Sequence, residues 1–397
     1  MSSSSRLQTP AQLFTAFCLL CVMAMILAGI APAFAASGLP DSAEFGYGVH
    51  IDVWGQQVDS ALQAVSAIGI DWIAIDFDWE RHWPERSAAL DLAELNKIMA
   101  FARENELSVL LSITNAPAWV MTPHGPDPEL TAGLVAQLAR LYPEVLLAVE
   151  LFPSANTYDG WGSAPDPADY ARLIKTTAES LQATSRSTVL VAAGLRPVDP
   201  AGGTKDLNDL DFLSGLYRAG VGAYFPIVGV RLPDTSADPL AAPGEDNPFV
   251  LRHYEAVRKV MLENEHSAGL IWITGFTWPE SLNTAATHTA KSTVEARNHL
   301  EASQTQWFNQ AFQMMKSQLY IGAAFYNCLN LPANDQLSVN SSSCLIRGES
   351  NQTRVHPAYT SLAQMISMGD SGANSFLHLE KILTPLQPKS VLKSGVP

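Results

Sequence analysis

Residues 149–156 read VELFPSAN and residues 158–161 read YDGW, and this stretch is the key to the fold. The apolar run up to Phe152 predicts a buried strand, while Pro153, Ser154 and Asn156 predict a loop directly after it. A nearly continuous apolar run is typical of a strand in a parallel sheet, because both faces of such a sheet are covered. The stretch therefore predicts a parallel strand that ends in a loop.

The same pattern repeats along the chain, with apolar runs alternating with segments of helical periodicity. Strands are predicted at Phe45–Asp52, Asp71–Phe77, Leu107–Thr114, Val145–Phe152, Thr188–Gly194, Ala223–Val230, Ala268–Gly275 and Tyr320–Tyr326. Helices are predicted at Val58–Ile68, Asp91–Glu104, Pro128–Tyr142, Pro167–Ala183, Lys205–Ala219, Asn247–Glu263, Val294–Lys316 and Pro357–Met368. Strands that alternate with helices form a parallel sheet, and eight such units close a TIM (β/α)8 barrel. An open doubly wound sheet is the alternative, but no G-x-G-x-x-G motif follows the first strand.

Composition agrees with one large domain. Of the 397 residues, 47% are hydrophobic and 16% are charged, against about 25% charged residues in typical soluble proteins. The net charge of -15 argues against a nucleic-acid partner and against binding to anionic membrane surfaces. The predicted class is therefore an α/β protein with a single barrel domain at residues 36–368.

The first 35 residues predict an export signal. Arg6 precedes the apolar segment Leu13–Ile30, and Ala33-Phe34-Ala35 is a small-x-small cleavage site. An uncleaved membrane anchor is the alternative, because about 18 apolar residues also approach the length that spans a bilayer. In both cases the rest of the chain is exported, to the cell envelope or beyond it. Residues 369–397 are poor in apolar residues and predict a loosely ordered tail.

Cysteine usage fits export. Cys18 and Cys21 lie in the predicted signal, so Cys328 and Cys344 remain in the mature chain and most simply form one disulfide. Neither has a further Cys or His at ligand spacing, so no metal is expected. No phosphate-binding glycine loop and no cofactor motif is present in the sequence.

Three strands resemble those of the retaining (β/α)8-barrel glycoside hydrolases of the cellulase and xylosidase type, which carry a catalytic Glu on strands 4 and 7. VELFPSAN resembles that family's E-I-W-N-E-P-N and has Ser154 at the acid/base position. Residues 270–279, LIWITGFTWP, resemble I-W-I-T-E-F-G-W and have Gly275 at the nucleophile position. On strand 6, FPIVGVRLP resembles F-D-V-V-A-V-H-P-Y, with Arg231 in place of the His. The resemblance covers about Gly46 to Met368, and it implies a barrel that lacks both catalytic carboxylates.

Retaining hydrolysis needs two carboxyl groups about 5 Å apart, one as general acid and one as nucleophile. The pKa of a serine hydroxyl is too high for the first role, and glycine offers no group for the second. Asp78, Glu80 and Asp159 are the candidate relocated acids, although each is also explained as a solvated or structural acid. Asp76, Asp78 and Glu80 are expected on one face of the second strand and its exit, and Glu150 is expected deeper, in hydrogen bonds of the barrel interior.

Aromatic residues gather at or beyond the predicted strand ends. Sugar rings stack their C–H faces on indole and phenol rings, so such residues predict a carbohydrate-binding groove. The alternative is that some of them only fill the top of the barrel. The candidates are Trp54, Trp79, Trp83, Trp119, Tyr158, Trp161 and Trp278.

Three hypotheses follow. The favoured one is an exported pseudoenzyme that binds a polysaccharide, an oligosaccharide or a protein partner without turnover. The second is an active O-glycosyl hydrolase with relocated carboxylates. The third is a structural module of the cell surface with a closed barrel mouth. The sequence predicts neither the sugar nor the oligomeric state.

Overall fold

The computed structural model describes residues 45–52, 54, 58–185, 187–198, 205–232, 238–244, 248–278, 294–330, 344–349 and 352–369. All of them belong to one compact unit, Gly38–Pro397. The predicted signal at residues 1–35 and the predicted tail beyond residue 369 lie outside the described residues, so both stay predictions.

Eight parallel strands form a closed barrel. They are β1 (Gly46–His50), β2 (Trp72–Asp78), β3 (Ser108–Thr114), β6 (Leu146–Leu151), β7 (Val189–Leu195), β8 (Ile227–Leu232), β9 (Leu270–Phe276) and β10 (Ile321–Tyr326). Neighbours in the chain are neighbours in the sheet, and β10 pairs with β1 to close the ring. This arrangement confirms the predicted TIM barrel in a single domain.

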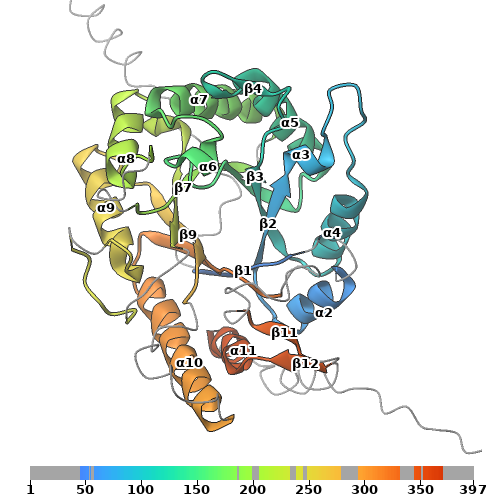
Figure 1. Cartoon of the computed structure of the whole chain (residues 1–397), viewed down its shortest axis with the longest axis vertical. Coiled ribbons are helices and arrows are strands. Elements are labelled where there is room, and N and C mark those ends of the chain that lie inside the picture. Colours follow the sequence, from blue (N-terminus) through green and yellow to red (C-terminus); the bar gives the residue numbers. More distant parts are fainter. Residues whose placement is uncertain are drawn as a thin grey trace, which may run out of the picture. The chain divides into compact units, whose positions relative to one another are not determined.

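The helices surround the barrel strands (Figure 1). They are α2 (Val58–Ile68), α4 (Ala93–Glu104), α5 (Pro128–Leu141), α7 (Pro167–Thr184), α8 (Asp209–Arg218), α9 (Tyr254–Glu263), α10 (Val294–Lys316) and α11 (Pro357–Gly369). Side chains cap several starts: Asp127 accepts hydrogen bonds from two backbone N–H groups of α5, and Asp166 accepts one from α7. A proline in the first turn of both helices fits the same geometry.

Three predicted element boundaries are wrong. The helix predicted from Asn247 begins as α9 only at Tyr254, after the 3-10 turn η2 (Leu251–His253). The sixth barrel strand is predicted from Ala223, but Gly222–Tyr224 forms the 3-10 turn η1 and β8 begins at Ile227. Pro226 has no N–H to donate to a neighbouring strand, so the ladder starts after it. A helix is predicted from Lys205, but α8 starts at Asp209 because Asn208 caps it.

The structure also contains short elements outside the eight barrel strands and the surrounding helices, and the sequence pattern does not predict them. The helix α3 (Trp79–His82) directly follows β2, and the helix α6 (Tyr158–Trp161) follows β6 after the turn at residues 152–157. They are too short to show helical periodicity in a sequence. The remaining elements are β4 (Met121–Thr122), β5 (Gly125–Pro126), η2 (Leu251–His253), β11 (Ile346–Glu349) and β12 (Gln352–Val355).

Two hydrophobic clusters form the core, one between the strands and the helices and one inside the barrel. The inner cluster includes Trp72, Trp272 and Phe325, and the two indole rings meet edge to face at 4.9 Å. Gly48 is needed for this packing, because a Cβ there would lie 2.3 Å from the ring of Phe325. These rings occupy the lower part of the barrel interior.

The predicted disulfide between Cys328 and Cys344 is present. It joins the segment after β10 to the segment before β11. Among the described residues, no helix combines the length and the apolar character that a membrane crossing requires.

Candidate functional site

A polar layer lies directly above the aromatic filling of the barrel. The register places Asp76 of β2 beside Ser112 of β3, and Ser112 beside Glu150 of β6. Since these residues share the inward-facing parity of Trp72 and Ala148, their side chains point into the barrel. His50 of β1, Arg231 of β8 and Thr274 of β9 complete the layer.

Glu150 is the deepest member of this layer, and none of its side chain is exposed. Its Oε2 accepts a 2.7 Å hydrogen bond from the hydroxyl of Ser112. Its Oε1 has no hydrogen bond of good geometry. The hydroxyl of Thr274 is nevertheless close enough to lower the pKa of Glu150. Burial raises the pKa of Glu150, and Arg231 and the two hydroxyl groups offset this only in part. The predicted interior role of Glu150 is confirmed.

Arg231 stands at the centre of the layer. Its Nη2 lies 3.3 Å from Asp76 Oδ1, 3.7 Å from Glu150 Oε2 and 3.5 Å from His50 Nε2. Its side chain is 16% exposed. Desolvation would lower the pKa of this guanidinium, but the Asp76 and Glu150 carboxylates more than offset it. The positive charge of Arg231 therefore lies close to two carboxylates, which come from different strands.

The side chain of Arg231 passes over Gly275. A Cβ added at Gly275 would lie 3.3 Å from Arg231 Cγ and 3.4 Å from Arg231 Nε. In relatives of the resembled family this position carries the nucleophile. Here the space next to it is occupied by a cation.

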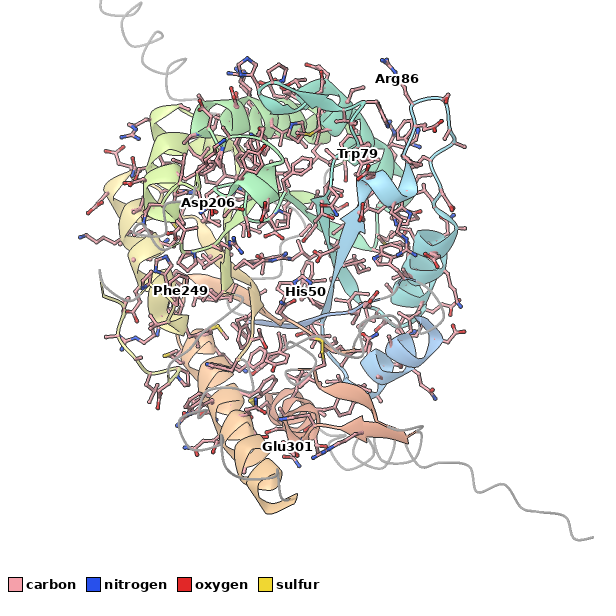
Figure 2. The ribbon with its side chains drawn as sticks, in the orientation of Figure 1. His50, Trp79, Arg86, Asp206, Phe249 and Glu301 are labelled. Carbon is pink, nitrogen blue, oxygen red and sulfur yellow. A yellow bond between two sulfur atoms is a disulfide. The ribbon has the colours of Figure 1, made fainter. Side chains whose placement is uncertain are left out.

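His50 lies near the middle of the ring of helices (Figure 2). Its Nε2 is 2.5 Å from the carbonyl oxygen of Thr274, which can only accept, so Nε2 carries a proton. Burial, and then the positive charge of Arg231, lower the pKa of His50 to about 4. His50 is therefore neutral near pH 7 and ties β1 to β9.

Asp76 is the solvent-facing acid of the layer, with 49% of its side chain exposed. Desolvation works to raise the pKa of Asp76, but Arg231 and then His50 outweigh it and the pKa is lowered. Asp76 and Glu150 thus approach the same guanidinium nitrogen. Glu150 is nevertheless sealed beneath Arg231, so a sugar could reach only one carboxyl group of this pair.

Ser154 follows β6 in a tight, left-handed turn. Both Phe152 (φ 47°) and Ser154 (φ 64°) have positive φ, which is uncommon for residues other than glycine. The backbone N–H of Ser154 donates to the carbonyl oxygen of Gly194, which anchors the turn to β7. The structure thus places Ser154 at the carboxyl end of strand 4 of the barrel and Gly275 at that of strand 7.

The three candidate relocated acids do not take part in the hydrogen bonds of this layer among the described residues. Asp78 caps α3 by accepting from the N–H of Arg81, and it also accepts from the amide of Asn115. Glu80 lies in α3, not on the strand, because helical backbone begins at Trp79; the expectation that it shares a face with Asp76 is wrong. Asp159 is exposed in the first turn of α6.

The candidate aromatic residues fall into two groups. Trp79, Trp161 and Trp278 are each 2% exposed or less and pack in the outer core. Trp54, Trp83 and Trp119 are half-buried, and Tyr158 is 46% exposed. Only this second group presents ring surface to solvent.

Trp54 lies beside the polar layer. Its indole Nε1 donates a 3.0 Å hydrogen bond to the carbonyl oxygen of Asp76, and the guanidinium of Arg81 stands 5.6 Å from its ring. The rings of Trp83 and Trp119 meet at 4.9 Å further along the same rim. Tyr158 lies on the other side, after β6, with the ammonium of Lys205 5.6 Å from its ring.

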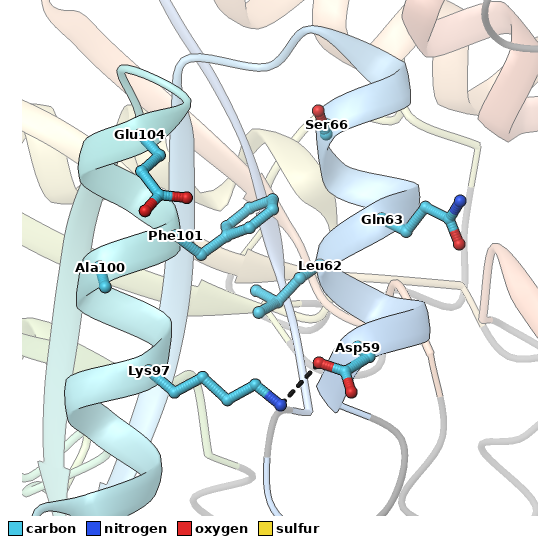
Figure 3. A pocket seen from close by; sticks show the side chains of 8 residues that line it. All are labelled: Asp59, Leu62, Gln63, Ser66, Lys97, Ala100, Phe101 and Glu104. Carbon is cyan, nitrogen blue, oxygen red and sulfur yellow. Dashed lines mark ion pairs between the residues drawn. The ribbon is translucent and has the colours of Figure 1, made fainter.

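A separate groove of about 490 Å³ lies on the outer surface, between α2 and α4 (Figure 3). Its floor is formed by Leu62 and Phe101, and Lys97 pairs with Asp59 at one end. It is remote from the carboxyl ends of the strands, where sites of this fold form.

Among the described residues, no group of His, Cys, Asp and Glu could hold a metal ion. The sequence pattern marks Arg231 only as a replacement on strand 6 and does not connect it to Asp76, Glu150 or His50. A charged residue inside an apolar strand was the available signal, because such a charge needs partners.

No protein-family model matches this chain, and no curated protein matches it. Solved structures with the same fold are found. A family 39 glycoside hydrolase from the gut symbiont Bacteroides cellulosilyticus WH2 has 16% identity and a TM-score of 0.60, over 84% of this chain and 66% of its own. The present chain thus spans just under two thirds of that enzyme.

Two further structures are similar at the same level. Xylanase 10B from Thermotoga maritima has 13% identity and a TM-score of 0.54, over 83% of this chain and 96% of its own. A conserved exported protein from Bacteroides fragilis has 10% identity and a TM-score of 0.56, over 81% of this chain and 77% of its own. The chain therefore has a TIM-barrel fold similar to that of glycoside hydrolases. At these identities the likeness concerns the fold alone.

Proposed function

We propose that this protein is an exported, non-catalytic carbohydrate-binding barrel. The observation that carries the proposal is the position of Arg231, which lies over Gly275 and binds Asp76 and Glu150. A nucleophile must reach the anomeric carbon as a free carboxylate, and Glu150 is buried beneath the guanidinium. Ser154 offers only a hydroxyl where an acid is needed.

The rim supports sugar binding. Trp54, Trp83, Trp119 and Tyr158 present partly exposed rings, and Asp76 adds a half-exposed acceptor beside Trp54. Indole rings flanked by polar groups are the usual means of holding a saccharide. The similar xylanase and family 39 enzyme act on glycans, which favours a saccharide over other ligands.

Export is supported by three independent features. These are the predicted signal at residues 1–35, the disulfide between Cys328 and Cys344, and the similarity to an exported protein from Bacteroides fragilis. Disulfides persist mainly in oxidising compartments.

The test has two measurements on the purified mature chain. Affinity gels and calorimetry with a panel of polysaccharides should detect binding, and Trp54→Ala should weaken it roughly 10-fold, the loss expected for one stacking ring. Leu319→Ala, which changes an 88% exposed residue just before β10, is the matched control and should bind normally. Aryl glycosides and the bound polysaccharide should show no turnover.

Hydrolysis by relocated acids is the second candidate function, because Asp76 and Glu150 do approach one another around Arg231. Release of reducing ends by the wild-type protein, lost in Asp76→Asn, Asp78→Asn, Glu80→Gln or Asp159→Asn, would establish it and overturn the proposal. Absence of binding to every glycan tested would instead favour a structural role.

A further inference from the structure

The guanidinium of Arg231 has an edge without acceptors. Among the described residues, its one hydrogen bond runs from Nη2 to Asp76 Oδ1. Its Nε is buried and has no partner. An arginine with 84% of its side chain buried normally uses more of its five N–H donors, since unpaired buried donors are costly.

The free edge faces the place from which a side chain is missing. Nε lies 3.4 Å from the position that a Cβ on Gly275 would take, so a carboxylate at this residue would pair with Arg231. Residue 275 is a glycine and supplies no such carboxylate. Because 16% of the Arg231 side chain is exposed, an acceptor that enters from the barrel mouth can still reach the guanidinium.

The charge of the layer allows an anion at this place. Glu150 Oε2 lies 3.7 Å from Nη2, beyond hydrogen-bonding distance, and accepts a hydrogen bond from Ser112 instead. Asp76 is half exposed and keeps access to water. His50 is neutral near pH 7 because burial lowers its pKa to about 4. The acids of the layer therefore use only one of the N–H donors of Arg231.

We propose that Arg231 selects saccharides that carry a carboxylate, so that the ligand of this barrel is a uronic acid-containing glycan. This inference rests on the proposed carbohydrate binding. The planar fork of a guanidinium matches a carboxylate through two parallel N–H···O bonds, which no neutral sugar hydroxyl reproduces. The pyranose ring would stack at the rim beside Trp54, with its carboxylate directed to the exposed part of the Arg231 side chain.

The experiment compares oligosaccharides of galacturonate, glucuronate and mannuronate, each beside its methyl ester, by calorimetry on the mature chain. Esterification removes the charge and keeps the sugar. At least one acid should bind 10-fold or more tightly than its ester, as expected for one charge-assisted bidentate pair.

Gly275→Glu is the informative variant. Its backbone accepts any residue, since Gly275 is not among the positive-φ glycines, and its nearest neighbour is the flexible Arg231 side chain. The new carboxylate should occupy the free edge and abolish the preference for acid over ester. Gly133→Glu is the matched control, because Gly133 of α5 is exposed with nothing within 4 Å. This control should keep the preference.

The outcomes separate this inference from the proposed function. Equal binding of acid and ester, or a preference that survives in Gly275→Glu, would overturn the role of Arg231 while carbohydrate binding stands. Binding of neutral glycans only would do the same. No binding of any glycan, acidic or neutral, would overturn both.

Discussion

Arg231 lies one residue from the end of β8, a strand that is otherwise apolar. A charge in such a strand must find counter-charges inside the barrel, because leaving it unpaired in a medium of low dielectric is costly. Asp76 and Glu150 provide them from β2 and β6. A single side chain thus connects three strands and also lies against Gly275 of β9.

Removing that cation should destabilise the protein. We expect Arg231→Met to lower the free energy of unfolding by about 3–5 kcal/mol, because it leaves the buried Glu150 carboxylate without its counter-charge. Urea unfolding at pH 7 measures the loss. Adding Glu150→Gln to this variant should recover more than about 1 kcal/mol, since it removes the orphaned charge. If the two substitutions are instead additive, the ion pair contributes nothing to stability.

At the scale of the elements, helix starts and strand ends depend on local chemistry that the sequence displays. Pro128 and Pro167 mark the starts of α5 and α7, and both predictions are confirmed. The start of β8 is mispredicted because the apolar run around Phe225 looks continuous, whereas Pro226 cannot donate to the ladder. Hydrophobic periodicity predicts the presence of helices and strands well. It predicts their ends less well where a single proline or a single capping residue sets the boundary.

The connection after β10 depends on the disulfide. Cys328 and Cys344 are 16 residues apart, and the N–H of Leu345 also donates to the carbonyl oxygen of Cys328. Closing a loop of this length removes about 3 kcal/mol of chain entropy from the unfolded state. We expect the Cys328→Ser, Cys344→Ser double variant to lose about that much in the free energy of unfolding.

Reduction provides the control for this prediction. Dithiothreitol should lower the Tm of the wild-type protein and leave that of the double variant unchanged. Equal unfolding free energies of the oxidised wild type and the double variant would show that other contacts hold this connection.

At the scale of the whole molecule, the loss of catalysis that we propose is distributed over several strands. In this proposal Ser154 stands on strand 4, and Gly275 on strand 7, where the resembled family has its two acids, and the side chain of Arg231 lies against Gly275. Reversing any one of these changes alone would not restore catalysis, because a retaining site needs two carboxyl groups, correct pKa values and room for the sugar ring.

Restoring both carboxylates should therefore fail to restore hydrolysis. We expect Ser154→Glu with Gly275→Glu to show no turnover of aryl glycosides, because the Glu at position 275 would pair with Arg231 and the positive φ of residue 154 misdirects the other. Product release is followed against a heat-inactivated control. Turnover above that background would mean that the barrel mouth is still shaped for catalysis.

The sequence by itself determined the barrel, its eight strands and the disulfide pairing. It also determined that Ser154 and Gly275 lie at the carboxyl ends of strands 4 and 7. Each of these follows from local pattern or from spacing along the chain. Only the tertiary structure decided the polar layer, since Arg231 lies 155 residues from Asp76 and 81 from Glu150, and closure of the sheet brings them together. It also decided which aromatic rings are buried and which reach the rim. Burial depends on packing across the ring of helices, which no stretch of sequence contains.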